Sequence, residues 1–179
     1  MQTKTQNKRS TFNYSTQDIL KASVDRIKAK ERGATILIPH VCNNVNAFGA
    51  GFAKAVAEEF PIVKESFHLL AKPILGKNQV VPVLKDKQYE HELIFINMIA
   101  QNGTVNIKNP RPLNYGALVF CMSEVKSLVK QLKNKSDTSK IEIHTPKFGS
   151  GLAGGNWDFI SDLIDDIWSD LTVYVYKLK

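Results

Sequence analysis

Two expected strands of this chain each lead directly into a glycine-rich loop and then into a helix, and this order constrains the fold more than any other feature. Residues 34–39 (ATILIP) form an almost continuous apolar run, which is typical of a strand buried on both faces of a parallel sheet. Residues 141–146 (IEIHTP) form the second of these strands. Because ligands of such sheets bind beyond the carboxyl ends of the strands, we expect both loops, residues 40–50 and 147–156, at one ligand-binding edge.

The remaining apolar patterns alternate between strand and helix along most of the chain. Pro82 indicates that its strand lies at an edge of the sheet, and Asn156 is placed to cap the last helix. This alternation predicts an α/β layer fold with a largely parallel central sheet. Further strands are expected at residues 10–15, 79–85, 91–101 and 171–178, and helices at residues 16–33, 51–60, 115–133 and after residue 156. The last helix is expected to bury Phe159, Ile160, Leu163 and Ile167.

Size and composition predict one folded domain. The chain has 179 residues, of which 43% are apolar, so we expect a single domain at residues 11–179 after a flexible basic tail at residues 1–10. No apolar stretch approaches the length of a membrane span, and the amino terminus lacks the apolar stretch of a signal peptide. We therefore expect a cytoplasmic protein that has no membrane partner.

Charge is distributed unevenly along the chain. The formal net charge is +7, and residues 1–33 carry eight basic side chains against three acidic ones, whereas residues 158–170 carry five aspartates and no basic side chain. A basic balance suits anionic ligands, from nucleotides to nucleic acids. No aromatic residues are interleaved with the basic ones to stack on bases, so nucleic acid is not the expected partner. Alternatively, the basic amino end serves only as a solubilising tail.

The two cysteines, Cys42 and Cys121, lie far apart and are expected to be free thiols. Cys121 falls on the apolar stripe of a helix and is expected in the core. Cys42 stands beside the asparagines of the first loop, where it is either close to a site or simply a small buried residue. Neither has the spacing or the histidines of a zinc site, so we expect no bound metal and no cofactor.

Both glycine-rich loops can hold an anion through the main chain. Helix starts offer free backbone N–H groups and a partial positive charge, and glycine lets the backbone approach an anion closely. Two such loops side by side predict a cradle for a diphosphate, and the alternative is that the glycines only cap helices and make turns. The chain has no G-x-x-x-x-G-K-[ST] loop, and only Gly49 and Gly51 match part of the G-x-G-x-x-G pattern.

Four motifs of the chain, taken together, resemble those of the macrodomain family. The closest resemblance is to the branch of ADP-ribose-1″-phosphate phosphatases and the terminal ADP-ribose protein glycohydrolase, and it extends from Asp18 to the end of the chain. It implies a three-layer α/β/α sandwich with a mixed, largely parallel central sheet. The motifs are residues 38–61 (IPHVCNNVNAFGAGFAKAVAEEFP), 96–102 (INMIAQN), 111–118 (RPLNYGAL) and 145–160 (TPKFGSGLAGGNWDFI).

The resemblance implies a binding site for ADP-ribose. Asp18 matches the acid that hydrogen-bonds the adenine amino group, with a helix cap as its alternative role, and Ile19 would offer backbone contacts to the same base. Asn43 matches the asparagine that holds the distal ribose, whereas Asn44 and Asn46 could be ordinary loop residues. The residues that match the two diphosphate loops are Phe48, Gly49, Ala50, Gly51 and Phe52, and Phe148, Gly149, Ser150, Gly151, Leu152, Ala153 and Gly154.

The resemblance also implies catalytic roles for His40, which matches a histidine of that branch, and for Asn43. With Asn43 orienting the ribose, a histidine here could act as acid or base at a phosphate or ester on the distal ribose. The alternative is a hydrogen-bonded histidine at a strand end. His144 also precedes a glycine-rich loop and could play either part, and Phe148 packs either on a ribose or in the core.

Two positions depart from the glycohydrolase branch. That branch has a lysine after the strand that here contains Met98 and Ile99, and an aspartate after the Gly-Leu of the second loop, where this chain has Ala153. These departures argue against a covalent lysine mechanism that removes ADP-ribose from glutamate. Ser150 stands where that branch has a cysteine, a small change that should leave the backbone contacts intact.

The sequence therefore predicts a protein that binds ADP-ribose or ADP-ribose-1″-phosphate and hydrolyses a group at the distal ribose, as an ADP-ribose-1″-phosphate phosphatase does. The first alternative is a non-catalytic reader of ADP-ribose, free or on ADP-ribosylated proteins, which the two departures favour. The second alternative is a nucleic-acid-binding module that uses the basic amino end and has a strongly salt-dependent affinity.

Overall fold

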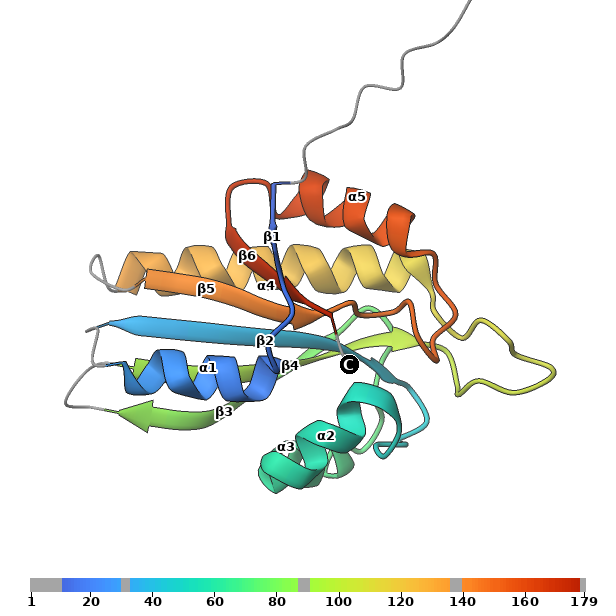
Figure 1. Ribbon diagram of the computed structural model, residues 1–179. Coiled ribbons are helices and arrows are strands. Elements are labelled where there is room, and N and C mark those ends of the chain that lie inside the picture. The colour runs from blue at the N-terminus through green and yellow to red at the C-terminus, as the bar shows by residue number, and fades with distance from the viewer. Residues whose placement is uncertain (1–10, 30–32, 87–90, 136–139, 178–179) are drawn as a thin grey trace, which may run out of the picture.

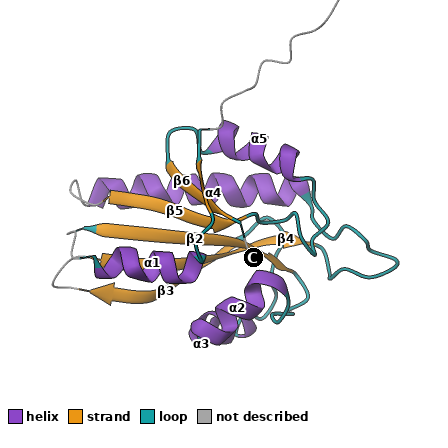
Figure 2. Cartoon of the chain, viewed as in Figure 1, coloured by secondary structure: helices purple, strands orange, loops and turns teal. Residues whose placement is uncertain are grey.

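A six-stranded sheet forms the middle layer of the molecule, and helices cover both of its faces (Figure 1). The computed structural model describes residues 11–29, 33–86, 91–135 and 140–177, so the expected tail at residues 1–10 lies outside the described residues. Figure 2 shows the strands and helices in separate colours. In chain order they are β1 (Asn13–Ser15), α1 (Ile19–Lys28), β2 (Ala34–Asn43), α2 (Gly51–Glu59), α3 (Pro61–His68), β3 (Asn78–Asp86), β4 (His91–Gln101), α4 (Tyr115–Lys135), β5 (Lys140–Pro146), α5 (Trp157–Ile167) and β6 (Thr172–Tyr176).

The strands lie in the order β1-β6-β5-β2-β4-β3. All neighbouring strands are parallel except β3 and β4, which are antiparallel. The prediction of an α/β fold with a mixed, largely parallel sheet is therefore confirmed. Pro82 lies in β3 at the edge of the sheet, as expected, and the pairing with β4 shifts just after it. An edge strand tolerates proline because one side of the strand needs no N–H donors for a neighbour.

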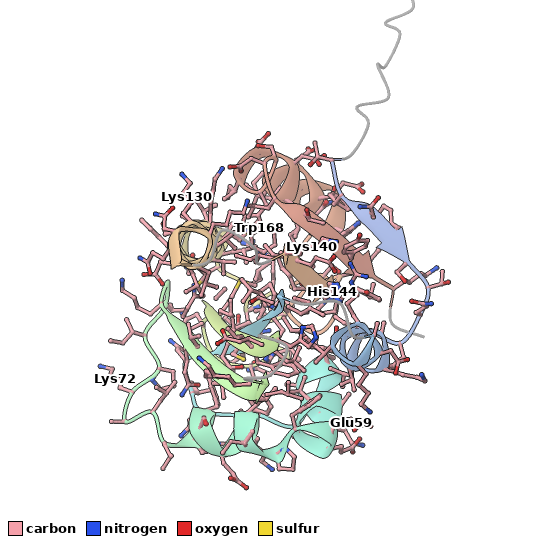
Figure 3. The ribbon with its side chains drawn as sticks, turned by 90° about the vertical axis from the view of Figure 1, so that its left-hand side faces the viewer. Glu59, Lys72, Lys130, Lys140, His144 and Trp168 are labelled. Carbon is pink, nitrogen blue, oxygen red and sulfur yellow. The ribbon has the colours of Figure 1, made fainter. Side chains whose placement is uncertain are left out.

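Alternate side chains of the central strand β2 point into two separate cores. Ile36 and Ile38 pack with α1, α2 and α3 on one face, and Leu37 packs with α4 and α5 on the other. The apolar run of β2 thus reflects burial on both faces of the sheet. Trp168 lies in the second core, where its indole N–H donates to the carbonyl of Met122 in α4 over 2.9 Å (Figure 3).

The segment after the first loop contains two helices rather than the single one expected. α2 ends at Glu59, and Pro61 is the first residue of α3. Proline is favoured at the first position of a helix, where its missing N–H is not needed, so the residue expected only to end one helix also begins another. Val63 and Phe67 lie one turn apart on α3 and are both fully buried.

Two further expectations about local structure are wrong. Phe159 is 47% exposed and packs its ring against Tyr115, while Ile164 is buried instead. β2 continues to Asn43, beyond the expected end of the strand, so His40 lies inside a strand and not at the start of a loop. The pairing of β2 with β4 shifts only between Cys42 and Asn43, and the loop begins there.

Candidate functional site: a pocket between two glycine-rich turns

A pocket of about 570 Å³ opens at the carboxyl ends of β2, β4 and β5. Pockets of this size hold small ligands. Two segments line much of it: the first turn, residues 43–52, and the second turn, residues 147–155. In Figure 1 these turns lie where the parallel strands end, near the start of α2 and the long loop that follows β4. The structure thus brings the two glycine-rich segments together at one edge of the sheet.

Asn43 holds the first turn in shape. Its side-chain oxygen accepts hydrogen bonds from the backbone N–H groups of Val45, over 3.1 Å, and Ala47, over 3.0 Å. Its side-chain nitrogen donates to the carbonyl of Ala47 over 2.6 Å. An asparagine nitrogen carries two hydrogens, so one donor of Asn43 is left for a ligand in the pocket.

Asn44 and Asn46 connect the first turn to neighbouring segments. The side-chain oxygen of Asn44 accepts from the N–H of Gly103 over 2.8 Å, and its nitrogen donates to the side chain of Asn102 over 3.0 Å. Asn46 has a φ of 57°, in the left-handed region, and its side-chain oxygen lies 2.9 Å from Nδ1 of His68. Both residues therefore stabilise the loop.

α2 begins at the pocket without a side-chain cap. Its cap position is Ala50, which has no hydrogen-bonding side chain. By contrast, Asp18 caps α1 by accepting from the N–H of Lys21 over 2.8 Å. Asn156 caps α5, as expected, by accepting from the N–H of Phe159 over 3.0 Å. An uncapped helix start has free N–H donors and a partial positive charge, and both favour an anion.

The second turn is stabilised by its own hydrogen bonds and by one aromatic side chain. The hydroxyl of Ser150 donates to the carbonyl of Lys147 over 2.9 Å. Phe148 is buried, and its ring packs against Trp168 with centroids 5.9 Å apart, so the core role is present. Phe148 also lines the pocket, and its contact with a ribose stays a prediction. Ser150 and Gly154 lie outside the lining of the pocket, unlike the other expected residues of this turn.

The glycines of the two turns serve different purposes. A Cβ added at Gly49 or at Gly151 would meet no atom within 4 Å, and both glycines line the pocket. A Cβ at Gly155 would lie 2.4 Å from Leu113 and 2.6 Å from the carbonyl oxygen of Gly149. Gly155 therefore allows the second turn to pack against the chain, whereas Gly49 and Gly151 leave the main chain open to a ligand.

Asp18 and Ile19 lie at the start of α1, outside the lining of the pocket. Asp18 is exposed, and the helix-cap role left open by the sequence is present. Ile19 is only 1% exposed, and its carbonyl accepts from the hydroxyl of Ser23 over 2.7 Å. Adenine contacts at these two residues remain a prediction.

His40 lies among aromatic rings beneath the first turn. Its ring packs edge-on against those of Phe48, Phe52 and Phe95, with centroids 5.8, 5.5 and 6.3 Å away. Burial lowers the pKa of His40 to about 4, an effect that the side chain of Asn97 partly opposes. His40 lines the pocket yet is only 2% exposed, and its Nε2 makes no hydrogen bond within the described chain. The histidine is therefore neutral at neutral pH.

His144 lies in a hydrogen-bonded network beside α1 (Figure 3). Its Nδ1 is 2.9 Å from the hydroxyl of Ser23 and 3.1 Å from that of Tyr176, and its Nε2 is 3.2 Å from Glu142. Arg26 also pairs with Glu142 over 2.7 Å. The hydrogen bond from His144, together with Arg26, lowers the pKa of Glu142 to about 2 although burial opposes the shift. His144 is outside the pocket lining, so this network joins α1 to β5.

Nine pocket-lining residues are missing from the sequence-based prediction of site residues: Val41, Cys42, Ala47, Ala53, Gln101, Thr104, Val105, Pro146 and Lys147. Gln101 ends β4 beside Asn43 of β2, and Lys147 directly follows β5. Both lie at carboxyl ends of parallel strands, so the rule that placed the two loops could have identified them. Thr104 and Val105 belong to the long loop after β4, whose turn-forming residues do not predict its path.

The positions that depart from the glycohydrolase branch are apolar and buried here. Met98 and Ile99 are 0% and 2% exposed, and Ala153 is 4% exposed at the wall of the pocket. Cys42 and Cys121 are buried free thiols, and burial raises the pKa of Cys121 to about 12 and that of Cys42 still further. Such thiols are poor nucleophiles because the thiolate is scarcely populated.

Metal-ligand clusters and membrane-spanning helices are both absent from the described residues. Within residues 11–29, 33–86, 91–135 and 140–177, no three His, Cys, Asp or Glu side chains gather so that they could hold a metal ion. Over the same part of the chain, no helix combines the length and the apolar character needed to cross a membrane.

Two curated proteins are similar to this chain in sequence, although no protein-family model matches it. An uncharacterized 17.5 kDa protein in the tk-vs intergenic region of Enterobacteria phage T4 is 27% identical over 144 residues, which cover 77% of this chain and 83% of the phage protein. An ADP-ribose 1″-phosphate phosphatase of Lodderomyces elongisporus is 24% identical over 155 residues, which cover 80% of this chain and 88% of the phosphatase.

Several solved structures are similar to the whole described chain. A protein of unknown function from Bacteroides thetaiotaomicron has a TM-score of 0.70 at 26% identity, covering 93% of this chain and 98% of its own. A macrodomain protein from Streptomyces coelicolor has a TM-score of 0.67 at 26% identity, covering 94% and 99%. Thermosipho africanus DarTG, solved in complex with ADP-ribose, has a TM-score of 0.59 at 17% identity, covering 93% and 42%. These similarities, together with the strand order and the position of the pocket, show that the chain has the macrodomain fold.

Proposed function

We propose that the pocket binds ADP-ribose with the diphosphate between the two turns. The observation that carries this proposal is the pocket of about 570 Å³ with the uncapped start of α2 on one side and the open main chain at Gly151 on the other. Both sides offer backbone donors to phosphate oxygens. A structure of the same fold was solved with ADP-ribose, which supports this choice of ligand.

The ends of the ligand extend toward two different residues in this proposal. The remaining side-chain donor of Asn43 meets a hydroxyl of the distal ribose, because Asn43 lies in the pocket lining. Asp18 accepts a hydrogen bond from the adenine amino group. Asp18 lies outside the pocket lining, so the adenosine end has to extend beyond the pocket toward α1.

We further propose that the protein hydrolyses ADP-ribose-1″-phosphate, as the similarity to a phosphatase suggests. Water adds to phosphorus, the P–O bond to the ribose breaks, and inorganic phosphate and ADP-ribose leave. With a pKa of about 4, His40 is unprotonated at neutral pH, so it can accept a proton from that water and then return it to the ribose oxygen that leaves. Orientation of the substrate between the turns would supply much of the rate.

Titration calorimetry with ADP-ribose, ADP and AMP tests the binding proposal. We expect ADP-ribose to bind more tightly than ADP, because only ADP-ribose reaches Asn43, and ADP to bind more tightly than AMP, because the second turn holds a second phosphate. Equal affinities for all three would contradict a site for the distal ribose. No binding of ADP-ribose would refute the proposed function as a whole.

Release of inorganic phosphate from ADP-ribose-1″-phosphate tests the hydrolytic step. We expect turnover by the unaltered protein, and loss of turnover with retained ADP-ribose affinity in His40→Leu, which keeps the site apolar. His68→Asn serves as the control, because His68 is exposed outside the pocket lining and asparagine keeps a donor near the position of Nδ1, which contacts Asn46. Unchanged turnover in His40→Leu would exclude His40 as the base.

A non-catalytic reader of ADP-ribose is the second candidate, and the surroundings of the distal site favour it. Ala153 offers no functional group at the wall of the pocket, and His40 is enclosed by three phenylalanine rings. Tight binding of ADP-ribose without any phosphate release would establish this second candidate. The same two measurements therefore separate the reader from the hydrolase.

A further inference from the structure

Lys147 differs from other lysines of the structure in what surrounds its charge. It directly follows β5 and contributes to the pocket lining. Its Nζ lies 5.0 Å from the centroid of the Trp157 ring and 5.6 Å from that of the Tyr14 ring. Lys77, by contrast, has its Nζ 2.8 Å from a carboxylate oxygen of Glu124. No carboxylate of the described chain forms an ion pair with Lys147.

The two rings around Lys147 are fixed relative to each other. The indole N–H of Trp157 donates to the hydroxyl of Tyr14 over 3.1 Å. Tyr14 belongs to β1 and Trp157 is the first residue of α5. Phe12 supports the Tyr14 ring edge-on, with centroids 5.1 Å apart. The aromatic cage, Tyr14 and Trp157, therefore joins two elements that are far apart in the sequence around a third, the end of β5.

An aromatic cage holds an ammonium group without neutralising it. The ring faces attract the cation through their quadrupole but carry no net charge, whereas a carboxylate partner would cancel most of the field that a ligand meets. Among the residues that line the pocket, Lys147 is the only one with a charged side chain at neutral pH, since His40 is neutral there. Lys147 therefore brings one uncompensated positive charge to the edge of the pocket, beside two rings that lie outside its lining.

We propose that Lys147 binds the phosphate on the adenosine side of the ligand and that the aromatic cage positions its ammonium group. The inference rests on the proposed function, because it takes ADP-ribose as the ligand. Tyr14 lies in β1, shortly before Asp18 in the sequence. We therefore place the cage between the second turn and the proposed adenine contact. Lysine suits a phosphate as a compact point charge. The diphosphate is then held by main-chain donors and by one side-chain charge.

Calorimetry on charge variants tests the role of Lys147. Lys147→Gln removes the charge and keeps most of the length of the side chain, and Lys147→Arg keeps the charge. Lys54→Gln is the matched control, because Lys54 is an exposed lysine of α2 near the pocket and pairs with Glu58 on the same helix. Each protein is titrated with ADP-ribose, AMP and adenosine at low salt and at about 1 M salt, where the screening length falls to about 3 Å.

We expect Lys147→Gln to weaken ADP-ribose and AMP by about tenfold at low salt and by much less at high salt. Adenosine carries no phosphate, so its affinity should change little. Lys147→Arg should keep most of the affinity, and Lys54→Gln should match the unaltered protein. An unchanged affinity of Lys147→Gln, or a loss as large in Lys54→Gln, would overturn the inference. An equal loss for adenosine would also overturn it, because Lys147 would then act through the fold.

The outcome for the cage and the outcome for the proposed function are separable. Tyr14→Leu removes a ring that is 56% exposed, and we expect it to weaken ADP-ribose by a few fold with the salt dependence retained. Tyr14→Phe keeps the ring but loses the hydrogen bond from Trp157, so its loss of affinity should be smaller than that of Tyr14→Leu. Binding of ADP-ribose that is indifferent to every one of these variants overturns only the role of Lys147. Absence of ADP-ribose binding by the unaltered protein overturns both proposals.

Discussion

The two turns that enclose the pocket are built in opposite ways. The first turn is stabilised by hydrogen bonds between the side chain of Asn43 and its backbone and packs on the aromatic surroundings of His40, and a Cβ at its Gly49 would face open space. The second turn packs tightly, because a Cβ at Gly155 would collide with Leu113 and with a backbone oxygen. Glycine in a ligand-binding turn is thus not one signal: Gly49 of the first turn and Gly151 of the second serve access, whereas Gly155 of the second serves packing.

The largest expected effect is the pH dependence of the free energy of unfolding that His40, buried beneath the first turn, produces. Burial lowers the pKa of His40 from 6.5 to about 4, so between these values the unfolded chain binds more protons than the folded one. The free energy of unfolding should therefore fall by about 3 kcal/mol as the pH drops from about 6.5 to about 4. Urea unfolding of the protein and of His40→Leu at pH 7 and pH 4.5 measures this change.

The variant His40→Leu shows whether protonation of His40 causes this fall in the free energy of unfolding. His40→Leu should lose much of the fall in stability over that interval, because it has no group to protonate there. The shift at Glu142, whose pKa is lowered to about 2, acts mainly below pH 4.5 and so falls outside the window. If His40→Leu kept the whole pH dependence, the enclosure of His40 would not be its source.

The packing of the second turn predicts a loss of stability when a methyl group is added at Gly155. In Gly155→Ala the new Cβ would meet the carbonyl oxygen of Gly149, which is backbone and cannot swing away. Overpacking of this kind destabilises by about 2 kcal/mol. Urea unfolding measures the change, and Gly151→Ala is the control from the same turn, with no atom within 4 Å of the new Cβ. Equal unfolding free energies for the two variants would contradict the contrast between the turns.

The open space at Gly49 predicts the reverse pattern, a loss of affinity without a loss of stability. In Gly49→Ala the methyl group enters the space where we propose the diphosphate, so the affinity for ADP-ribose should fall by about tenfold, or about 1.4 kcal/mol. Titration calorimetry and urea unfolding of the same sample separate the two effects. If Gly49→Ala unfolded at lower urea concentration yet bound ADP-ribose normally, Gly49 would serve packing, as Gly155 does.

The smallest expected effect concerns Asp18, which belongs to neither turn. Asp18→Ala removes the cap of α1 and should destabilise the protein by about 1 kcal/mol. Asp18→Ser keeps a capping oxygen but removes the carboxylate, so its stability should be nearly unchanged while its affinity for ADP-ribose falls by a few fold. If Asp18→Ser bound ADP-ribose as tightly as the unaltered protein, Asp18 would be a helix cap and no more.

The sequence was sufficient for the architecture because its strongest signals are local. The apolar run of β2 and the glycines after β2 and β5 are enough to place both turns at one edge of a largely parallel sheet. The sequence does not single out α3, because Pro61 is as typical of the end of a helix as of its start, although Val63 and Phe67 have helical spacing. The extra length of β2 was missed because polar residues inside a strand resemble the start of a loop.

The chemical surroundings of the site were less predictable because they depend on contacts between distant residues. Nothing local to His40 indicates that Phe95 of another strand helps to enclose it and lower its pKa. The cage around Lys147 likewise needs Tyr14 and Trp157, which meet only after β1 and α5 have been placed. Each residue is unremarkable in the sequence, and its function as part of a site arises from the fold.

The absence of a capping side chain on α2 also affects the free protein. This short helix begins at Ala50 and Gly51 with N–H groups that no side chain of its own satisfies, whereas α5 has Asn156 for that purpose. A bound phosphate would complete α2 from outside, so the helix should become more rigid whenever the pocket is filled. Slower amide hydrogen exchange in α2, with little change in α5, would then report occupancy of the pocket from the backbone itself.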